Sequence, residues 1–245
     1  MCYHKSLTKT IDYLADYYSA TYDKVLEEVY SQHYHENGFD FLPTPIITSG
    51  RPGEFQMMNW GLIPWWSKSE TDALRIRVQT LNCISEEMFE KPAFKDVAKD
   101  GKRCLIPCTG FFEWRWMDEK GKMKVPYYIT IRERELFSIA GLYSRWKDRA
   151  NDKEYYSYTV LTTKANLLME KIHNSKKRMP VILPREYEKD WLNPNLTRDD
   201  VLALCQPLDD IRMTSYTISK LITSKKEETD VPKVLEPEAY AEVND

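Results

Sequence analysis

The spacing of apolar and polar positions changes character several times along the chain. Over residues 10–30 the apolar side chains recur at helical spacing, which predicts one amphipathic helix. Residues 54–63 favour a strand, which Pro64 ends. Residues 67–102 are polar and carry few strand signals, so we expect loops and short helices there.

From Arg103 onwards, short runs of β-branched and aromatic residues alternate with turn residues. These runs predict strands at residues 103–106, 110–116, 125–131, 136–142 and 155–162. We expect further helices at 166–172, 186–192 and 198–204, and further strands at 181–183 and 214–222. The consecutive strands indicate an antiparallel meander. We therefore predict a single α+β domain with a mainly antiparallel, curved, barrel-like β core and peripheral helices.

Charge divides the chain into two unequal parts. Residues 227–245 hold seven acids and one lysine, a charge of −6, whereas the whole chain carries −3. Residues 1–226 therefore carry +3, and within them residues 164–185 hold six basic side chains against one acid. We predict a folded domain at 1–224, able to face a phosphate backbone, and a charged, mobile acidic tail at 225–245.

Several function classes are disfavoured by composition. No apolar run reaches the roughly 18 residues of a membrane span, and the start of the chain lacks the layout of a secretion signal. Five cysteines without a C-x-x-C pair fit reduced thiols in the cytoplasm better than a disulfide framework. Cys104 and Cys108 lack a second pair of ligands, so we expect no metal, and without a Gly-rich phosphate loop we expect no cofactor.

Cys2 is the first residue with distinctive chemistry. A small second residue permits removal of Met1, which would leave an α-amine and a thiol on adjacent carbons. Such a 1,2-aminothiol forms a Schiff base with an aldehyde and then closes to a thiazolidine ring. The free groups titrate near about 8 and about 8.5, so we expect both to be partly reactive at neutral pH. Alone, Cys2 is equally well explained as an ordinary second residue.

Three other polar residues suit proton transfer or positioning. Strand alternation places Glu113 on the face opposite Phe112, either as a carboxyl of raised pKa that moves protons or as a surface partner of Arg115. His173 follows a predicted helix and is either a general acid or base, or a side chain that binds helix-end carbonyls. Asn82 offers an amide to a substrate oxygen or amine, or simply belongs to a turn.

Trp65 and Trp66 follow a predicted strand. Neighbours on an extended chain face opposite ways, so we expect one ring to pack inside and the other to face outward. An exposed indole beside basic residues suits stacking on unpaired bases, and core packing is the alternative.

The segments that hold these residues occur in a characteristic order. They are Cys2, Trp60-Gly61-Leu62-Ile63-Pro64-Trp65-Trp66, Asn82 to Glu86, Arg103-Cys104-Leu105-Ile106-Pro107, Gly110-Phe111-Phe112-Glu113-Trp114, and Ile172-His173 with Arg178-Met179-Pro180-Val181-Ile182-Leu183. Together they resemble the SOS-response-associated peptidase (SRAP) family, over about residues 2–183.

The resemblance implies a function for most of these residues. In that family the processed cysteine captures the ring-opened aldehyde of an abasic site in single-stranded DNA as a thiazolidine crosslink. It implies that Cys2 is the nucleophile, that Asn82 orients it, and that Glu113 and His173 move protons. It also implies that DNA is contacted by Trp65, Trp66, Thr162 and Arg178. Self-removal of Met1, a possible abasic-site lyase side activity and action at the nucleoid follow as expectations, and we expect a monomer.

Three departures from the family pattern affect the predicted grip on DNA. Tyr3-His4 stands where Gly-Arg is common, Ile84 replaces an arginine, and three extra residues separate His173 from Arg178. We expect the lost positive charge to be supplied by Arg75, Arg77, Lys176 and Lys177.

Two other functions remain open from the residues alone. In an amidohydrolase, the α-amine of Cys2 would serve as its own base. In a non-enzymatic reader of modified bases or RNA, the Trp pair would matter and Cys2 would not.

Overall fold

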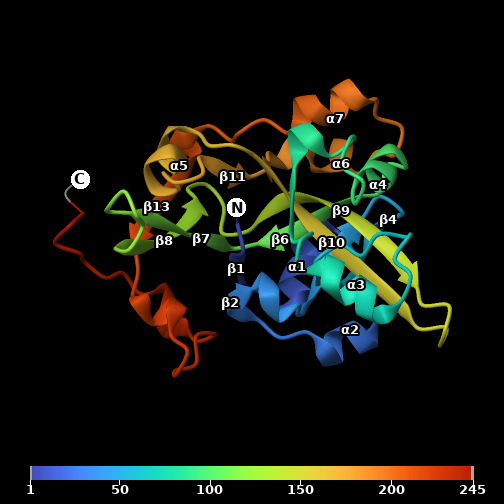
Figure 1. Ribbon diagram of the computed structural model, residues 1–245, viewed down its shortest axis with the longest axis horizontal. Helices are drawn as coiled ribbons and strands as arrows, with labels where there is room; N and C mark the ends of the chain where they lie inside the picture. The colour runs from blue at the N-terminus through green and yellow to red at the C-terminus, as the bar shows by residue number, and fades with distance from the viewer. Residues whose placement is uncertain (1, 244–245) are drawn as a thin grey trace.

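The computed structural model describes residues 2–243 of the 245-residue chain. The strands are β1 (His4–Leu7), β2 (His33–Asn37), β3 (Pro43–Thr48), β4 (Arg51–Trp60), β5 (Asn82–Ile84), β6 (Arg103–Cys108), β7 (Gly110–Trp116), β8 (Lys124–Ile131), β9 (Phe137–Lys147), β10 (Glu154–Lys164), β11 (Arg178–Pro180), β12 (Ile182–Leu183) and β13 (Met213–Thr217). The α-helices are α1 (Ile11–Tyr18), α2 (Lys24–Val29), α3 (Glu70–Arg77), α4 (Lys95–Lys99), α5 (Leu167–Ile172), α6 (Glu188–Trp191) and α7 (Arg198–Leu204). The strands gather in the middle and the helices lie around them (Figure 1), which confirms the predicted α+β fold.

Five strands close into a barrel. The order β10-β4-β3-β6-β9 returns to β10, because β9 and β10 also pair along most of their length. Four of these pairings are antiparallel, whereas β10 runs parallel to β4 and then, farther along, parallel to β5. A simple meander is therefore the wrong description. The segment between β4 and β5 crosses over through α3, so both strands reach β10 in the same direction.

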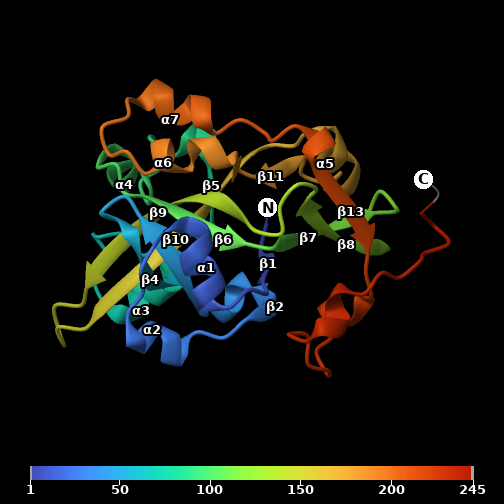
Figure 2. The same cartoon turned by 180° about the vertical axis from the view of Figure 1, so that it is seen from behind.

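A second sheet, in the order β13-β8-β7-β1-β2, lies beside the barrel. The chain passes from β6 in the barrel directly to β7 in this sheet, and from β8 back to β9 in the barrel. In both views β1 lies near the middle of the molecule, between β2 and β7 (Figures 1 and 2). Cys2, two residues before β1, therefore lies inside the fold.

The predicted helix over residues 10–30 is in fact two helices. Helix α1 ends at Ser19, which adopts a left-handed conformation with φ 51°, and α2 starts anew with Asp23 as its N-cap. Between them the backbone N–H of Thr21 donates to the carbonyl of Gly53, a residue of β4, at 2.8 Å. This bridge to the barrel interrupts the helix, although the apolar spacing continues.

The other elements follow the sequence closely. Helices α5 and α7 lie where they are predicted, with Asn166 capping α5 and a Thr197–Asp200 capping box starting α7. Residues 67–102 hold short helices and loops, with the addition of β5, which is too short to be recognised from its pattern. The last predicted strand is shorter than expected, because residues 220–223 form a 3-10 turn.

The acidic C-terminal segment does not behave as the mobile tail that we expected. Residues 232–235 form a 3-10 turn in which Val234 is fully buried. The carboxylate of Asp230 accepts hydrogen bonds from the backbone N–H groups of Tyr34 and His35 on β2, at 2.6 and 3.0 Å, and contacts His33 at 2.6 Å. The segment is therefore packed against the second sheet, and the division at residue 224 stays a prediction.

Candidate active site

Strand register brings the start of the chain to Glu113. In the β1–β7 pairing Lys5 lies opposite Phe111 and Ser6 opposite Gly110, so the same register continued backwards puts residue 3 level with Glu113. Cys2 is 1% exposed. Burial raises the pKa of its thiol well above the usual value, and the nearby Glu113 adds to this effect. The buried thiol therefore keeps its proton at neutral pH, and its partial reactivity there, expected for the free group, stays a prediction.

Glu113 lies on the inner face of β7. Phe111, two residues earlier, packs in the same buried cluster as Cys2, whereas Phe112 and Trp114 pack in another, so the predicted alternation is confirmed. The Glu113 side chain is buried, and burial raises its pKa to about 8. Its Oε1 has no hydrogen-bond partner within residues 2–243. The alternative of a surface ion pair with Arg115 is therefore wrong.

His173 is the residue that ends α5, and its imidazole faces Glu113. Its Nδ1 lies 2.7 Å from the carbonyl oxygen of Arg178 and 3.8 Å from Glu113 Oε1. Because a carbonyl only accepts, Nδ1 carries the proton of the neutral ring and Nε2 carries the lone pair. Burial lowers the pKa of His173 to about 4. The imidazole is therefore neutral at pH 7, and the carbonyl that it binds belongs to Arg178 of β11, not to the end of α5.

Asn82 begins β5 and lies opposite Val160 of β10. Its side chain is 8% exposed, and neither its amide nitrogen nor its amide oxygen has a hydrogen-bond partner in the described part of the chain. A buried amide without partners costs roughly 1–3 kcal/mol, so native proteins seldom keep one without a use for it. Asn82 thus offers both a donor and an acceptor to a bound group.

All four predicted catalytic residues lie in or beside one buried cluster. The cluster contains Cys2, Leu81 next to Asn82, Phe111 two residues before Glu113, and Ile172 next to His173. Four segments that are far apart in the sequence therefore converge here. The Cys2 thiol and the neutral imidazole of His173 lie near the protonated carboxyl of Glu113, and Leu81, the neighbour of Asn82, packs in the same cluster as Cys2.

Two residues implied in DNA contact are engaged within the protein. Arg178 forms two hydrogen bonds with the Glu86 carboxylate, at 2.8 and 2.7 Å, and a third with the Thr162 carbonyl at 2.6 Å. The Thr162 side chain is fully buried, with its hydroxyl 3.4 Å from the Cys83 carbonyl. Thr162 therefore has no surface through which to touch DNA, contrary to the prediction. In the sequence, Glu86 is recognised only as the end of a motif, and no local pattern predicts its ion pair with Arg178.

Both tryptophans of the pair are exposed, which corrects the expectation that one ring would pack inside. Trp65 is 62% exposed and Trp66 38%. Their indole N–H groups donate to Asp96 at 2.7 Å and to the Pro92 carbonyl at 3.3 Å. Beyond Pro64 the chain turns, so strand alternation does not apply to these two residues.

The predicted replacement cations divide into two kinds. Lys176, Lys177 and Arg75 are exposed, and Arg75 forms a surface ion pair with Asp72 at 2.8 Å. Arg77 is only 8% exposed, and its guanidinium donates to the carbonyls of Trp60 and Phe41, each at 3.1 Å. Arg77 is therefore a structural residue, and the prediction that it faces DNA is wrong.

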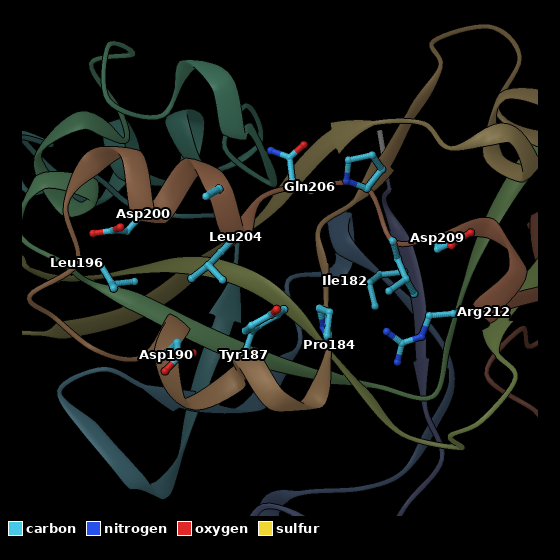
Figure 3. A pocket seen from close by; sticks show the side chains of 13 residues that line it. Ile182, Pro184, Tyr187, Asp190, Leu196, Asp200, Leu204, Gln206, Asp209 and Arg212 are labelled. Carbon is cyan, nitrogen blue, oxygen red and sulfur yellow. The ribbon is translucent and has the colours of Figure 1, made fainter.

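A separate apolar pocket of about 530 Å³ lies among β12, α6 and α7 (Figure 3). Ile182, Tyr187 and Leu204 line it, together with acidic side chains such as Asp190 and Asp200. None of the predicted site residues lines this pocket, so it is distinct from the cluster around Cys2. Within residues 2–243, no group of three or more His, Cys, Asp or Glu side chains is arranged to hold a metal ion. No helix in that range is both long and apolar enough to cross a membrane.

Comparison with known proteins places this fold and site in one family. The model of the SOS response associated peptidase (SRAP) family matches residues 1–225. Abasic site processing protein YoqW of Bacillus subtilis is 40% identical over 192 residues, 78% of this chain and 80% of that protein. Abasic site processing protein HMCES of Xenopus tropicalis is 31% identical, over 70% of this chain and 54% of its own length.

A solved structure is similar over almost the whole chain. A protein from Bacteroides thetaiotaomicron superposes with a TM-score of 0.90 at 38% identity, covering 97% of this chain and all of that one. The agreement of family model, sequence relatives and fold leads to one conclusion. The chain belongs to the SOS response associated peptidase family.

Proposed function

We propose that this protein processes abasic sites in single-stranded DNA by capturing their aldehyde on Cys2, after removal of Met1 by the protein itself. The observation that supports the proposal is the grouping of Cys2 and His173 around Glu113, and we propose that Asn82, whose amide has no partner in the described chain, joins them. The names of the relatives, abasic site processing proteins, support the same substrate. Met1 lies outside the described residues, so its removal is part of the proposal.

The protonation states suggest which residue gives a proton and which takes one. Glu113, with a pKa of about 8, holds its proton at neutral pH and is suited to act as the acid. His173, with a pKa of about 4, is neutral, and we propose that its Nε2 takes a proton from the Cys2 thiol. Such a base is needed because burial keeps the thiol protonated.

The proposed reaction is a condensation that balances without any further reactant. The α-amine of Cys2 forms a bond to C1′ of the ring-opened sugar, and the carbonyl oxygen leaves as water with help from Glu113. The sulfur then bonds to the same carbon, after His173 has received its proton, and a thiazolidine results. The departing water takes one hydrogen from the amine and one from Glu113, and the proton that His173 takes from the thiol is then passed to Glu113, which restores both residues.

A competing reaction explains why the thiol matters. The Schiff base acidifies the neighbouring carbon, so the 3′ phosphate can be eliminated and the strand cut, which is a lyase activity. Attack by sulfur on C1′, the carbon of the Schiff base, removes the Schiff base before elimination. We therefore propose that crosslinking is the main outcome and that strand cleavage is a side reaction.

We propose that four exposed residues form the surface that binds the unpaired strand. Trp65 and Trp66 present indole rings, and Lys176 and Lys177 lie on the loop directly after His173. Arg178 would have to exchange Glu86 for a phosphate, so we propose the two lysines as the first basic contacts.

The test is incubation with single-stranded DNA that bears one abasic site, followed by a denaturing gel. The wild type should give a stable covalent band, and Cys2→Ala should lose it while still cutting some DNA through its α-amine. Cys205→Ala is the matched control, because Cys205 is equally buried but lies at the end of α7 in the other core cluster. A durable crosslink with Cys2→Ala would refute the thiazolidine. Turnover of a small amide without affinity for single-stranded DNA would instead favour the amidohydrolase.

A further inference from the structure

One edge of β7 is left open beside the proposed site. Strand β8 pairs with β7 from Phe111 to Trp116, but β1 pairs with the other edge only at Gly110 and Phe111. Past Phe111, the edge that carried β1 has no strand partner in the described chain. Glu113 and Trp116 both lie in this stretch.

The side chain of Asn174 occupies this open edge at Trp116. The backbone N–H of Trp116 donates to Asn174 Oδ1 at 3.1 Å, and Asn174 Nδ2 donates to the Trp116 carbonyl at 2.9 Å. Two residues that exchange both hydrogen bonds in this way form the narrow pair of an antiparallel ladder. The side-chain amide of Asn174 thus makes, at Trp116, the two hydrogen bonds that a neighbouring strand would make.

The residues on either side of this contact are the two proton carriers. Asn174 directly follows His173, and Trp116 is three residues after Glu113 on the same strand. The loop also closes on itself: Lys177, at φ 51°, donates its N–H to the His173 carbonyl at 2.8 Å, and the His173 ring bonds to Arg178. Those bonds shape the loop but do not hold it to β7, whereas Asn174 does.

We propose that Asn174 is a positioning residue that clamps the His173 loop to β7 and so sets the spacing between His173 and Glu113. The expected effect on the crosslinking rate rests on the proposed function, whereas the positioning of the His173 loop by Asn174 does not. Packing of α5 against Phe111 also helps to place His173. The Asn174 hydrogen bonds therefore adjust the position of His173 and do not determine it alone. A misplacement of about 1 Å can slow a reaction roughly 100-fold, so removal of the amide should slow capture by roughly 10- to 100-fold.

The variants are Asn174→Ala, which removes both bonds, and Asn174→Gln, which keeps a donor and an acceptor on a longer arm. Asn151→Ala is the matched control, because that exposed asparagine also accepts a backbone hydrogen bond, from Lys153, but lies in the β9–β10 turn. With Asn174→Ala the maximal crosslinking rate should fall, and the DNA concentration for half-maximal rate should stay unchanged. Asn174→Gln should recover part of the rate, and Asn151→Ala should match the wild type.

A second measurement separates the clamp from the proposed function. The His173 imidazole can be titrated by NMR without DNA, and in Asn174→Ala its midpoint should move towards that of an exposed histidine. If the wild type fails to crosslink while this midpoint still moves, the proposed function falls and the clamp stands. If both the midpoint and the crosslinking rate of Asn174→Ala equal those of the wild type, the clamp is refuted.

Discussion

Glu113 and His173 are buried side by side, and burial shifts their pKa values in opposite directions. It favours the neutral form of each, so the carboxyl keeps its proton up to about pH 8 and the imidazole loses its own above about pH 4. Their 3.8 Å contact is therefore a neutral acid beside a neutral base at pH 7, and not an ion pair. This state avoids the desolvation of two charges and leaves each group in the form that its proposed role needs.

The pH dependence of capture should report Glu113. Because the protonated carboxyl is the proposed acid, the wild-type rate should fall as the pH rises through about 8. Glu113→Gln should be slower at pH 7 and should lack this fall. The α-amine of Cys2 titrates in both proteins, so the difference between the two pH profiles isolates residue 113. Equal profiles above pH 8 would contradict the assignment.

Stability offers an independent check on the same carboxyl. The folded state raises the pKa of Glu113 from an ordinary 4.5 to about 8, so between these values only the folded chain binds the proton. The free energy of unfolding should therefore fall as the pH rises from 4.5 to 8. In Glu113→Gln this contribution should be missing when unfolding by urea is followed across that range.

At the scale of elements, the break between α1 and α2 depends on a single backbone conformation. Ser19 is exposed and left-handed, a conformation that costs a non-glycine residue about 1 kcal/mol. Its N–H nevertheless caps the carbonyl of Ala15. The left-handed conformation of Ser19 ends the helix, and two residues later Thr21 bonds to Gly53.

Ser19→Gly should accordingly leave the fold unchanged and raise the free energy of unfolding by up to about 1 kcal/mol. Ser19→Val should lower it, because a β-branched side chain tolerates this conformation worst. Chemical denaturation of the two variants and the wild type gives the comparison. A Ser19→Gly protein less stable than the wild type would show that its side chain has a role that the backbone does not reveal.

Sequence patterns could identify those elements whose structure depends mainly on residues that are close in sequence. The alternation along Gly110–Trp116 correctly put Glu113 on the face opposite Phe112 but did not tell which face is buried, and α5 and α7 lie where the sequence predicts helices. Tertiary contacts decided the rest. Arg77 resembled a surface cation, but its guanidinium is buried against the Trp60 and Phe41 carbonyls, and neither partner is near it in sequence. The depth of Cys2 also depends on pairing with β7, more than a hundred residues away.

At the scale of the whole molecule, the C-terminal segment is fastened to the start of the chain. Asp230 satisfies two backbone N–H groups of β2, and β2 pairs with β1, the strand that follows Cys2. Val234 adds an apolar anchor in the small cluster with Phe112. The acidic composition of this segment suggested a solvated tail, but Asp230, Val234 and further hydrogen bonds such as that from Tyr216 to the Leu235 carbonyl hold it to the sheet.

Asp230→Ala should lower the free energy of unfolding by roughly 1–3 kcal/mol, since it leaves two backbone donors without their charged acceptor. Glu227→Ala removes the same charge from an exposed position in the same segment and should change stability little. Thermal unfolding measured side by side distinguishes loss of this contact from loss of acidic charge. Equal effects of the two substitutions would mean that charge alone matters.

The closure of the core around Cys2 has a consequence for the order of events during synthesis. The cluster that encloses this side chain includes Leu208 and Met213. A ribosome releases the chain from its N-terminus, so the first residues wait in solvent until nearly all of the others have emerged. During that interval the thiol of Cys2, which the folded chain buries, is open to aldehydes or oxidants in the cell.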